Sequence, residues 1–132
     1  MKVGSLFSGL GGIELGLEAT GGFVTKWHSE IDPYPCEMLA KHWPGVPNLG
    51  DICEIDWSKV EPVDLVCGGF PCQDISVAGK GAGIAEGTRS GLWFEFARCI
   101  RALRPRYILV ENVSALAFRG LDRVLGDLAE AG

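Results

Sequence analysis

The sequence of 132 residues lacks three features that would assign it to a common class of protein. Its five cysteines form no CxxC pair and no secretory leader precedes them, which argues against a disulfide or zinc framework. No apolar run approaches the roughly 18 residues of a membrane span. Positive charge is also scarce, because the formal net charge is -5 and the sequence pI is about 5.0. We therefore expect a reduced, cytoplasmic protein with no membrane segment and no metal site.

Glycine is present in excess. It accounts for 19 of the 132 residues, against a usual share of about 7%. These glycines gather in a few loops instead of forming a repeat. The hydrophobic fraction of 47% is enough for a packed core. We expect one compact α/β domain over residues 1–132, with glycine loops that bring the backbone close to a ligand.

Charge is unevenly distributed along the chain. Residues 1–70 hold ten acids and four bases, whereas residues 71–132 hold seven acids and eight bases. Bases outnumber acids between residues 80 and 106, and two interpretations of this segment remain open. It forms either a solvated helix face or a surface that faces phosphate groups. The bases are Lys80, Arg89, Arg98, Arg101, Arg104 and Arg106.

Short apolar runs alternate with helical patterns. Strands are predicted over residues 3–7, 23–29, 63–67 and 107–110, and residues 50–52 are predicted as the end of a short strand or its loop. Helices are predicted over residues 13–19, 33–40, 92–103 and 121–131. This order indicates a doubly wound, mostly parallel α/β sheet. We expect the sheet to be incomplete at the C-terminus, because the last helix ends where a further strand would begin.

Distinctive residues follow the predicted strands at their carboxyl ends. The turn Gly9-Leu10-Gly11-Gly12 follows the first strand, and Glu30 follows the second. Pro71-Cys72-Gln73 and Glu111-Asn112 follow two later strands. In open parallel sheets, ligands bind outside the carboxyl ends of the strands, where the strand order reverses. We therefore expect these groups to face one crevice.

The glycine turn and Glu30 suit an adenosine-containing cofactor. Glycines let backbone N–H groups approach a ligand, and a carboxylate 21 residues after Gly9 can bind a ribose diol. Asp51 could accept a hydrogen bond from an adenine amino group, or it could cap a turn. Position 14 holds Glu instead of the third glycine of the dinucleotide fingerprint, so a tight turn without a ligand is the alternative.

Cys72 and Glu111 are the candidate catalytic residues. Cys72 lies in a loop framed by glycine and proline, whereas Cys36, Cys67 and Cys99 fit positions for small buried hydrophobic residues. Glu111 directly follows an apolar strand, so we expect it to be desolvated, with a raised pKa that suits a proton donor. A capping or salt-bridged carboxylate is the alternative. A nucleophile, a proton donor and a nucleoside site together indicate activation of an electron-poor ring.

Three ordered motifs resemble those of the cytosine-5 DNA methyltransferase family. They are Phe7-Ser8-Gly9-Leu10-Gly11-Gly12, Gly69-Phe70-Pro71-Cys72-Gln73 and Glu111-Asn112-Val113. The resemblance covers nearly the whole chain. It implies a Rossmann-like, S-adenosylmethionine-dependent methyltransferase fold, of which residues 1–132 are the N-terminal, catalytic portion. It also implies that an arginine-containing motif, the target-recognition region and a returning helix lie beyond residue 132.

The resemblance implies a role for individual residues. Glu30 would hold the ribose hydroxyls, Ile31 would pack on the adenine, and Asp51 with Ile52 would complete the adenine site. The implied cofactor-binding residues are Phe7, Gly9, Leu10, Gly11, Gly12, Glu30, Ile31, Asp51, Ile52, Pro71 and Leu92. The implied substrate-binding residues are Gln73, Ser76, Lys80 and Asn112.

The implied substrate is double-stranded DNA whose target cytosine has left the helix. Cys72 would attack C6 while Glu111 protonates N3, and C5 would then take the methyl group of S-adenosylmethionine. We expect the chain alone to be inactive or nearly so, and a complementing C-terminal chain is one way to complete it. The family implies a prokaryotic or phage protein, with restriction-modification as one context. The alternatives are an RNA cytosine-5 methyltransferase, a non-catalytic cofactor-binding subunit and, less well supported, a nicotinamide-dependent oxidoreductase.

Overall fold

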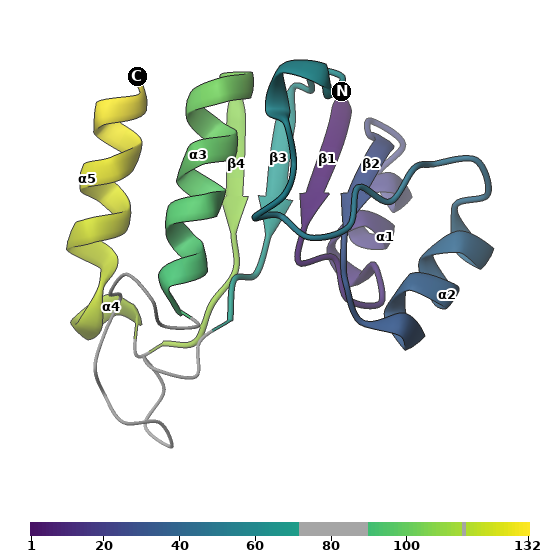
Figure 1. Cartoon of the computed structure of the whole chain (residues 1–132), viewed down its shortest axis with the longest axis horizontal. Helices are drawn as coiled ribbons and strands as arrows, with labels where there is room; N and C mark the ends of the chain where they lie inside the picture. Colours follow the sequence, from purple (N-terminus) through teal and green to yellow (C-terminus); the bar gives the residue numbers. More distant parts are fainter. Residues whose placement is uncertain (72–89, 115) are drawn as a thin grey trace.

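The computed structural model describes residues 1–71, 90–114 and 116–132. Within them, four parallel strands form one sheet in the order β2-β1-β3-β4 (Figure 1). The strands are β1 (Lys2–Leu6), β2 (Val24–Ser29), β3 (Leu65–Gly68) and β4 (Tyr107–Val110). The chain moves outward from β1 to β2 and then returns to β3 on the other side of β1. The strand order therefore reverses between β1 and β3, which confirms the predicted doubly wound, parallel architecture.

The predicted helices are present, with small differences at their ends. They are α1 (Gly12–Ala19), α2 (Pro33–His42), α3 (Trp93–Leu103) and α5 (Leu121–Ala131). The short helix α4 (Leu116–Arg119) and the 3-10 turns η1 (Trp57–Lys59) and η2 (Ser90–Leu92) were not predicted. Residues 50–52 form a loop and a turn, so the loop interpretation of that segment is the correct one. Of the helices in the described ranges, none is long and apolar enough to cross a membrane.

The sheet is packed differently on its two faces. A small cluster made by Val3, Leu65 and Cys67 packs against Ile13 and Leu17 of α1. The larger core lies on the other face, where α3 and α5 lie side by side next to β4 (Figure 1). Its buried aromatic residues include Trp27, Trp57, Phe70, Trp93 and Phe96. The larger core thus fixes the segment that leads from β3 towards residue 72.

Arg98 on α3 holds the loop that follows α2. Its guanidinium donates to the carbonyls of Ile52 at 2.7 Å and Ile55 at 3.0 Å, and its Nε atom lies 2.6 Å from Glu95. Arg101 forms a looser ion pair with Asp127, at 3.7 Å. Two of the bases in the segment of residues 80–106 therefore have partners within the chain, and the two interpretations of that segment stay open.

Candidate functional site

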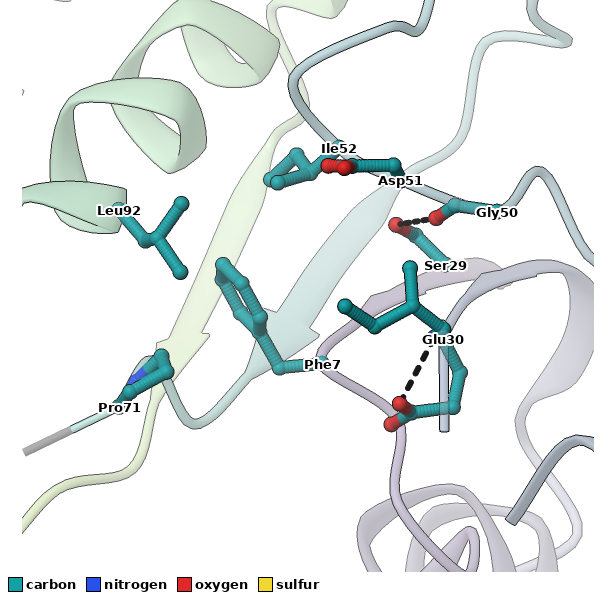
Figure 2. A pocket seen from close by; sticks show the side chains of 9 residues that line it. Phe7, Ser29, Glu30, Gly50, Asp51, Ile52, Pro71 and Leu92 are labelled. Atoms are coloured by element: carbon teal, nitrogen blue, oxygen red, sulfur yellow. Dashed lines mark hydrogen bonds between the residues drawn. The ribbon is translucent and has the colours of Figure 1, made fainter. Parts of the chain in front are cut away.

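A cavity of about 220 Å³ opens at the carboxyl ends of the strands, at the point where the strand order reverses (Figure 2). Its walls come from the ends of β1, β2 and β3, from the loop around residue 51 and from the turn that precedes α3. The lining residues are Phe7, Ser29, Glu30, Ile31, Gly50, Asp51, Ile52, Pro71 and Leu92. A mostly apolar hollow with a few polar groups at its rim is typical of a small-molecule site.

Phe7 lies in the middle of the residues that line this hollow. Figure 2 shows its ring between Leu92 and Pro71 on one side and Ser29 and Glu30 on the other. Its backbone adopts a φ of 51°, in the left-handed region that a bulky residue rarely occupies. Such strain costs about 1–3 kcal/mol and is concentrated at ligand sites. A strained backbone thus places an aromatic ring among the residues that line the cavity.

The glycine turn lies behind the cavity wall. Gly11 is the N-cap residue of α1 and has a φ of 80°. A Cβ atom there would lie 2.4 Å from the Trp43 ring, so only glycine fits. Gly9 donates its N–H to Oε2 of Glu30 at 2.8 Å. The predicted residues Gly9, Leu10, Gly11 and Gly12 do not themselves line the cavity. Of the four, Gly9 supports the wall through its hydrogen bond with Glu30.

Position 14, where a dinucleotide fingerprint has its third glycine, holds a buried glutamate. Glu14 and His28 are each 1% exposed, and Oε1 of Glu14 lies 3.5 Å from Nδ1 of His28. The two side chains thus face each other between α1 and β2, and neither of these two atoms has a hydrogen-bond partner among the described residues. The glutamate that replaces the third glycine of the fingerprint is therefore buried between these two elements.

The carboxylate of Glu30 is held by three backbone N–H groups. Besides Gly9, Ile31 donates to Oε1 at 2.8 Å and Asp32 donates to the same oxygen at 2.9 Å. A carboxylate has about four acceptor positions. Oε1 therefore uses both of its positions, whereas Oε2 keeps one for a further donor.

The loop around residue 51 forms the facing wall. The hydroxyl of Ser29 donates to the carbonyl of Gly50 at 2.8 Å, which joins the end of β2 to this loop (Figure 2). Asp51 accepts from the N–H of Cys53 at 2.9 Å, so it does cap a turn, while it also lines the cavity. Ile52 is buried, whereas Ile31 is 69% exposed. Ser29 and Gly50 were not predicted as lining residues, and their only signal in the sequence is their position beside Glu30 and Asp51.

Glu111 lies at the other end of the site, after β4. Its N–H donates to the carbonyl of Gly68 at 3.0 Å. A Cβ atom at Gly69 would lie 2.6 Å from Oε2 of Glu111, so the carboxylate rests against the segment that leads to residue 72. The expected desolvation of Glu111 is wrong, because the residue is exposed. The physical reason is its place beyond a short strand that has a neighbour on one side only among the described strands.

Asn112 also binds the backbone of the segment that leads to residue 72. Its Nδ2 atom donates to the carbonyl of Phe70 at 2.9 Å, while its Oδ1 atom accepts from the N–H of Val113. Phe70 is buried against Trp93, with ring centroids 5.5 Å apart. Asn112 therefore holds the backbone two residues before position 72, and its predicted contact with the substrate stays a prediction.

Two of the remaining cysteines are poor candidates for a nucleophile. Cys67 and Cys99 are fully buried, and desolvation raises the pKa of each thiol to about 12. A thiol with such a pKa is almost entirely protonated at neutral pH. The prediction that these two are buried hydrophobic positions is confirmed. Cys72, Gln73, Ser76 and Lys80 lie outside the described residues, so their roles remain predictions.

Residues 1–131 match the family of C-5 cytosine-specific DNA methylases. The chain belongs to this family. A type II methyltransferase of Bacillus subtilis, M2.BsuMI, is 49% identical over 117 residues, which are 86% of this chain and 29% of that protein. The orphan methyltransferase M.SPRI of Bacillus phage SPR is 36% identical, over 99% of this chain and 30% of its own length. The chain thus spans less than a third of each of these two relatives.

Solved structures of the family superimpose on nearly the whole chain. A protein assigned as a DNA modification methyltransferase and encoded within an E. coli prophage gives a TM-score of 0.71 at 28% identity, over 99% of this chain and 36% of its own. A mutant of Spodoptera frugiperda DNMT2 gives a TM-score of 0.70 at 19% identity, over 98% of this chain and 41% of its own, which shows the shared fold alone. The predicted Rossmann-like methyltransferase fold is confirmed.

Proposed function

We propose that this chain is the portion of a DNA cytosine-5 methyltransferase that binds S-adenosylmethionine and carries the attacking cysteine. The observation that supports this most strongly is the cavity at the switch point, because five separate segments contribute residues predicted for the cofactor. These residues are Phe7, Glu30, Ile31, Asp51, Ile52, Pro71 and Leu92. Relatives from bacteria and a phage also favour a cytoplasmic protein of such an origin.

The residues of the cavity fit an adenosine-bearing group. Oε2 of Glu30 retains an acceptor position for a ribose hydroxyl. The carboxylate of Asp51 suits the amino group of adenine, and Ile52 and Ile31 offer apolar surface to the purine. We assign Leu92 to the amino-acid end of the cofactor. When bound there, S-adenosylmethionine supplies an electrophilic methyl group.

The catalytic groups are Cys72 and Glu111. We propose that the thiolate of Cys72 attacks C6 of a cytosine that has left the duplex, while Glu111 donates a proton to N3. Addition at C6 makes C5 nucleophilic and divides a difficult substitution into easier steps. Glu111 is exposed in this chain, which leaves its carboxyl group accessible to a base. Gln73, Ser76 and Lys80 are proposed to contact DNA.

An uncovered part of the sheet supports the need for a further segment. Tyr107 and Leu109 of β4 are 44% and 40% exposed, whereas Leu65 and Cys67 on the adjacent strand are buried. Exposed apolar side chains on an edge strand are usually covered by another element. We propose that the remainder of the enzyme, on the same or a second chain, covers this face and completes the catalytic site.

Covalent trapping tests the proposed reaction. The chain would be mixed with the C-terminal part of M2.BsuMI that its match does not include, together with S-adenosylmethionine and duplex DNA that carries 5-fluorocytosine. Fluorine at C5 blocks the proton loss that would release the cysteine. We expect a covalent adduct on the peptide that contains Cys72, and no adduct with Cys72→Ser.

The matched positive control is the N-terminal part of M2.BsuMI in the same mixture. If that control traps DNA and this chain does not, the catalytic role is contradicted. Binding of S-adenosylhomocysteine without an adduct would then favour the second candidate, a non-catalytic cofactor-binding subunit. A parallel reaction with transfer RNA tests the RNA alternative.

A further inference from the structure

Asn48 joins the two loops that form the Glu30 end of the cavity. Its Oδ1 atom accepts from the N–H of Glu30 at 3.0 Å and from the N–H of Gly50 at 3.2 Å. Its Nδ2 atom donates to the carbonyl of Glu30 at 3.0 Å and to Sγ of Cys36 at 3.1 Å. The oxygen faces two donors and the nitrogen faces two acceptors, so these partners fix the orientation of the amide.

These contacts continue the pairing of β2 beyond its last residue. His28 donates to the carbonyl of Pro47 at 3.0 Å, and Leu49 donates to the carbonyl of His28 at 2.8 Å. β2 ends at Ser29, and Glu30 then pairs through both backbone groups with the side chain of Asn48. The side-chain amide thus supplies the donor and acceptor that a neighbouring strand would supply.

The carboxylate of Glu30 is oriented from both ends as a result. Gly9, Ile31 and Asp32 hold its oxygens, and Asn48 holds its backbone. A side chain fixed in this way loses little further freedom when a ligand binds. The free acceptor position of Oε2 is therefore preorganised only as long as the backbone of residue 30 stays in place.

We propose that Asn48 is a positioning residue for a ribose hydroxyl, acting through Glu30. The inference rests on the proposed nucleoside-binding function of the cavity. Asn48 is exposed at the surface and is not among the residues that line the cavity, so a direct contact with the ligand is not its role. Its substitution should therefore alter the recognition of ribose hydroxyls more than the recognition of the purine.

The test compares adenosine with 2′,3′-dideoxyadenosine, which lacks the ribose hydroxyls. Dissociation constants for the 132-residue chain and for Asn48→Ala would be measured by isothermal titration calorimetry. We expect the unaltered chain to prefer adenosine by about tenfold, as for one hydrogen bond to a charged group. In Asn48→Ala we expect this preference to fall to about twofold, because residue 30 loses both of its backbone contacts with residue 48.

Ser29→Ala is the matched control. The Ser29 hydroxyl joins the same two loops through Gly50 and has no hydrogen bond with Glu30 among the described residues. Its loss should weaken the binding of both nucleosides and leave the preference near tenfold. Asn48→Asp is the second variant, since it keeps the acceptor oxygen and the shape and cannot donate to the carbonyl of Glu30.

The outcomes distinguish a failure of the positioning role of Asn48 from a failure of the proposed function of the cavity. Unchanged preference in Asn48→Ala, or an equal loss in Ser29→Ala, overturns the positioning role. If Asn48→Ala shows no cooperative thermal unfolding, Asn48→Asp decides, and a preference that stays near tenfold there overturns the role as well. If the unaltered chain binds neither nucleoside, the proposed function itself is contradicted. If it binds both equally, the ribose assignment of Glu30 fails and the inference fails with it.

Discussion

The two ends of the site differ in how completely the chain itself holds them. At the β2 end, Glu30 is fixed by three backbone N–H groups and by Asn48. At the β4 end, Glu111 is exposed and rests against Gly69, next to the uncovered side chain of Leu109. The difference teaches that the described residues themselves hold the proposed nucleoside end, whereas at the proposed catalytic end they leave Glu111 and Leu109 exposed.

Paired substitutions at the two ends would test this comparison most strongly. Glu30→Gln should weaken adenosine binding by about tenfold or more, because the amide replaces a charged acceptor and holds Gly9 less well. Glu111→Gln should leave adenosine binding unchanged, because Glu111 does not line the cavity. Calorimetric titration of both variants measures the two effects.

One result for this pair of variants would contradict the independence of the two ends. A loss of adenosine binding in Glu111→Gln as large as that in Glu30→Gln would mean that the two ends are not independent. The thermal unfolding of each variant serves as the control, since a general loss of folding would lower both affinities together.

A smaller effect is expected from Glu18, a carboxylate that joins α1 to the start of β2 and to Trp43, away from Glu30. Glu18 accepts from the hydroxyl of Thr25 at 2.6 Å, from the N–H of Thr25 at 2.8 Å and from Nε1 of Trp43 at 2.9 Å. Desolvation opposes ionisation, but these hydrogen bonds outweigh it and hold the pKa of Glu18 below its ordinary value of 4.5. The stabilisation is therefore complete above that value and is lost as the pH falls through the pKa of the folded state.

Glu18→Gln should lower the free energy of unfolding by about 1–2 kcal/mol at pH 7, and by much less near pH 3. Urea unfolding at the two pH values measures the difference. Glu37→Gln is the control, because its ion pair with Lys41 is exposed and should contribute below about 0.5 kcal/mol. An equal loss for Glu18→Gln at both pH values would show that the charge of Glu18 does not stabilise the packing of α1 on β2.

Hydrophobic periodicity was sufficient to predict most of the fold. The helix over residues 121–131 has the predicted bounds, because its apolar positions repeat at helical spacing. The turn η1 was not predicted, and the sequence did not decide between the two interpretations of residues 50–52. Both segments depend on contacts with distant residues, such as the bonds from Arg98 to Ile52 and Ile55, which leave no periodic pattern in the local sequence.

The candidate site was predicted where a side chain itself lines the cavity. Glu30 was found because a carboxylate directly after a strand, 21 residues after a glycine turn, is distinctive. Asn48 was missed because it acts through the backbone of a residue 18 positions earlier. The burial of Glu111 was predicted wrongly because exposure depends on what packs beside β4, which the sequence of the strand does not reveal.

A crystal structure of this chain with S-adenosylhomocysteine is the most direct test of the central claim. We expect the nucleoside to lie in the cavity of Figure 2, with a ribose hydroxyl within hydrogen-bonding distance of Oε2 of Glu30 and the adenine beside Ile52. A ligand bound elsewhere, or a ribose turned away from Glu30, would contradict the account.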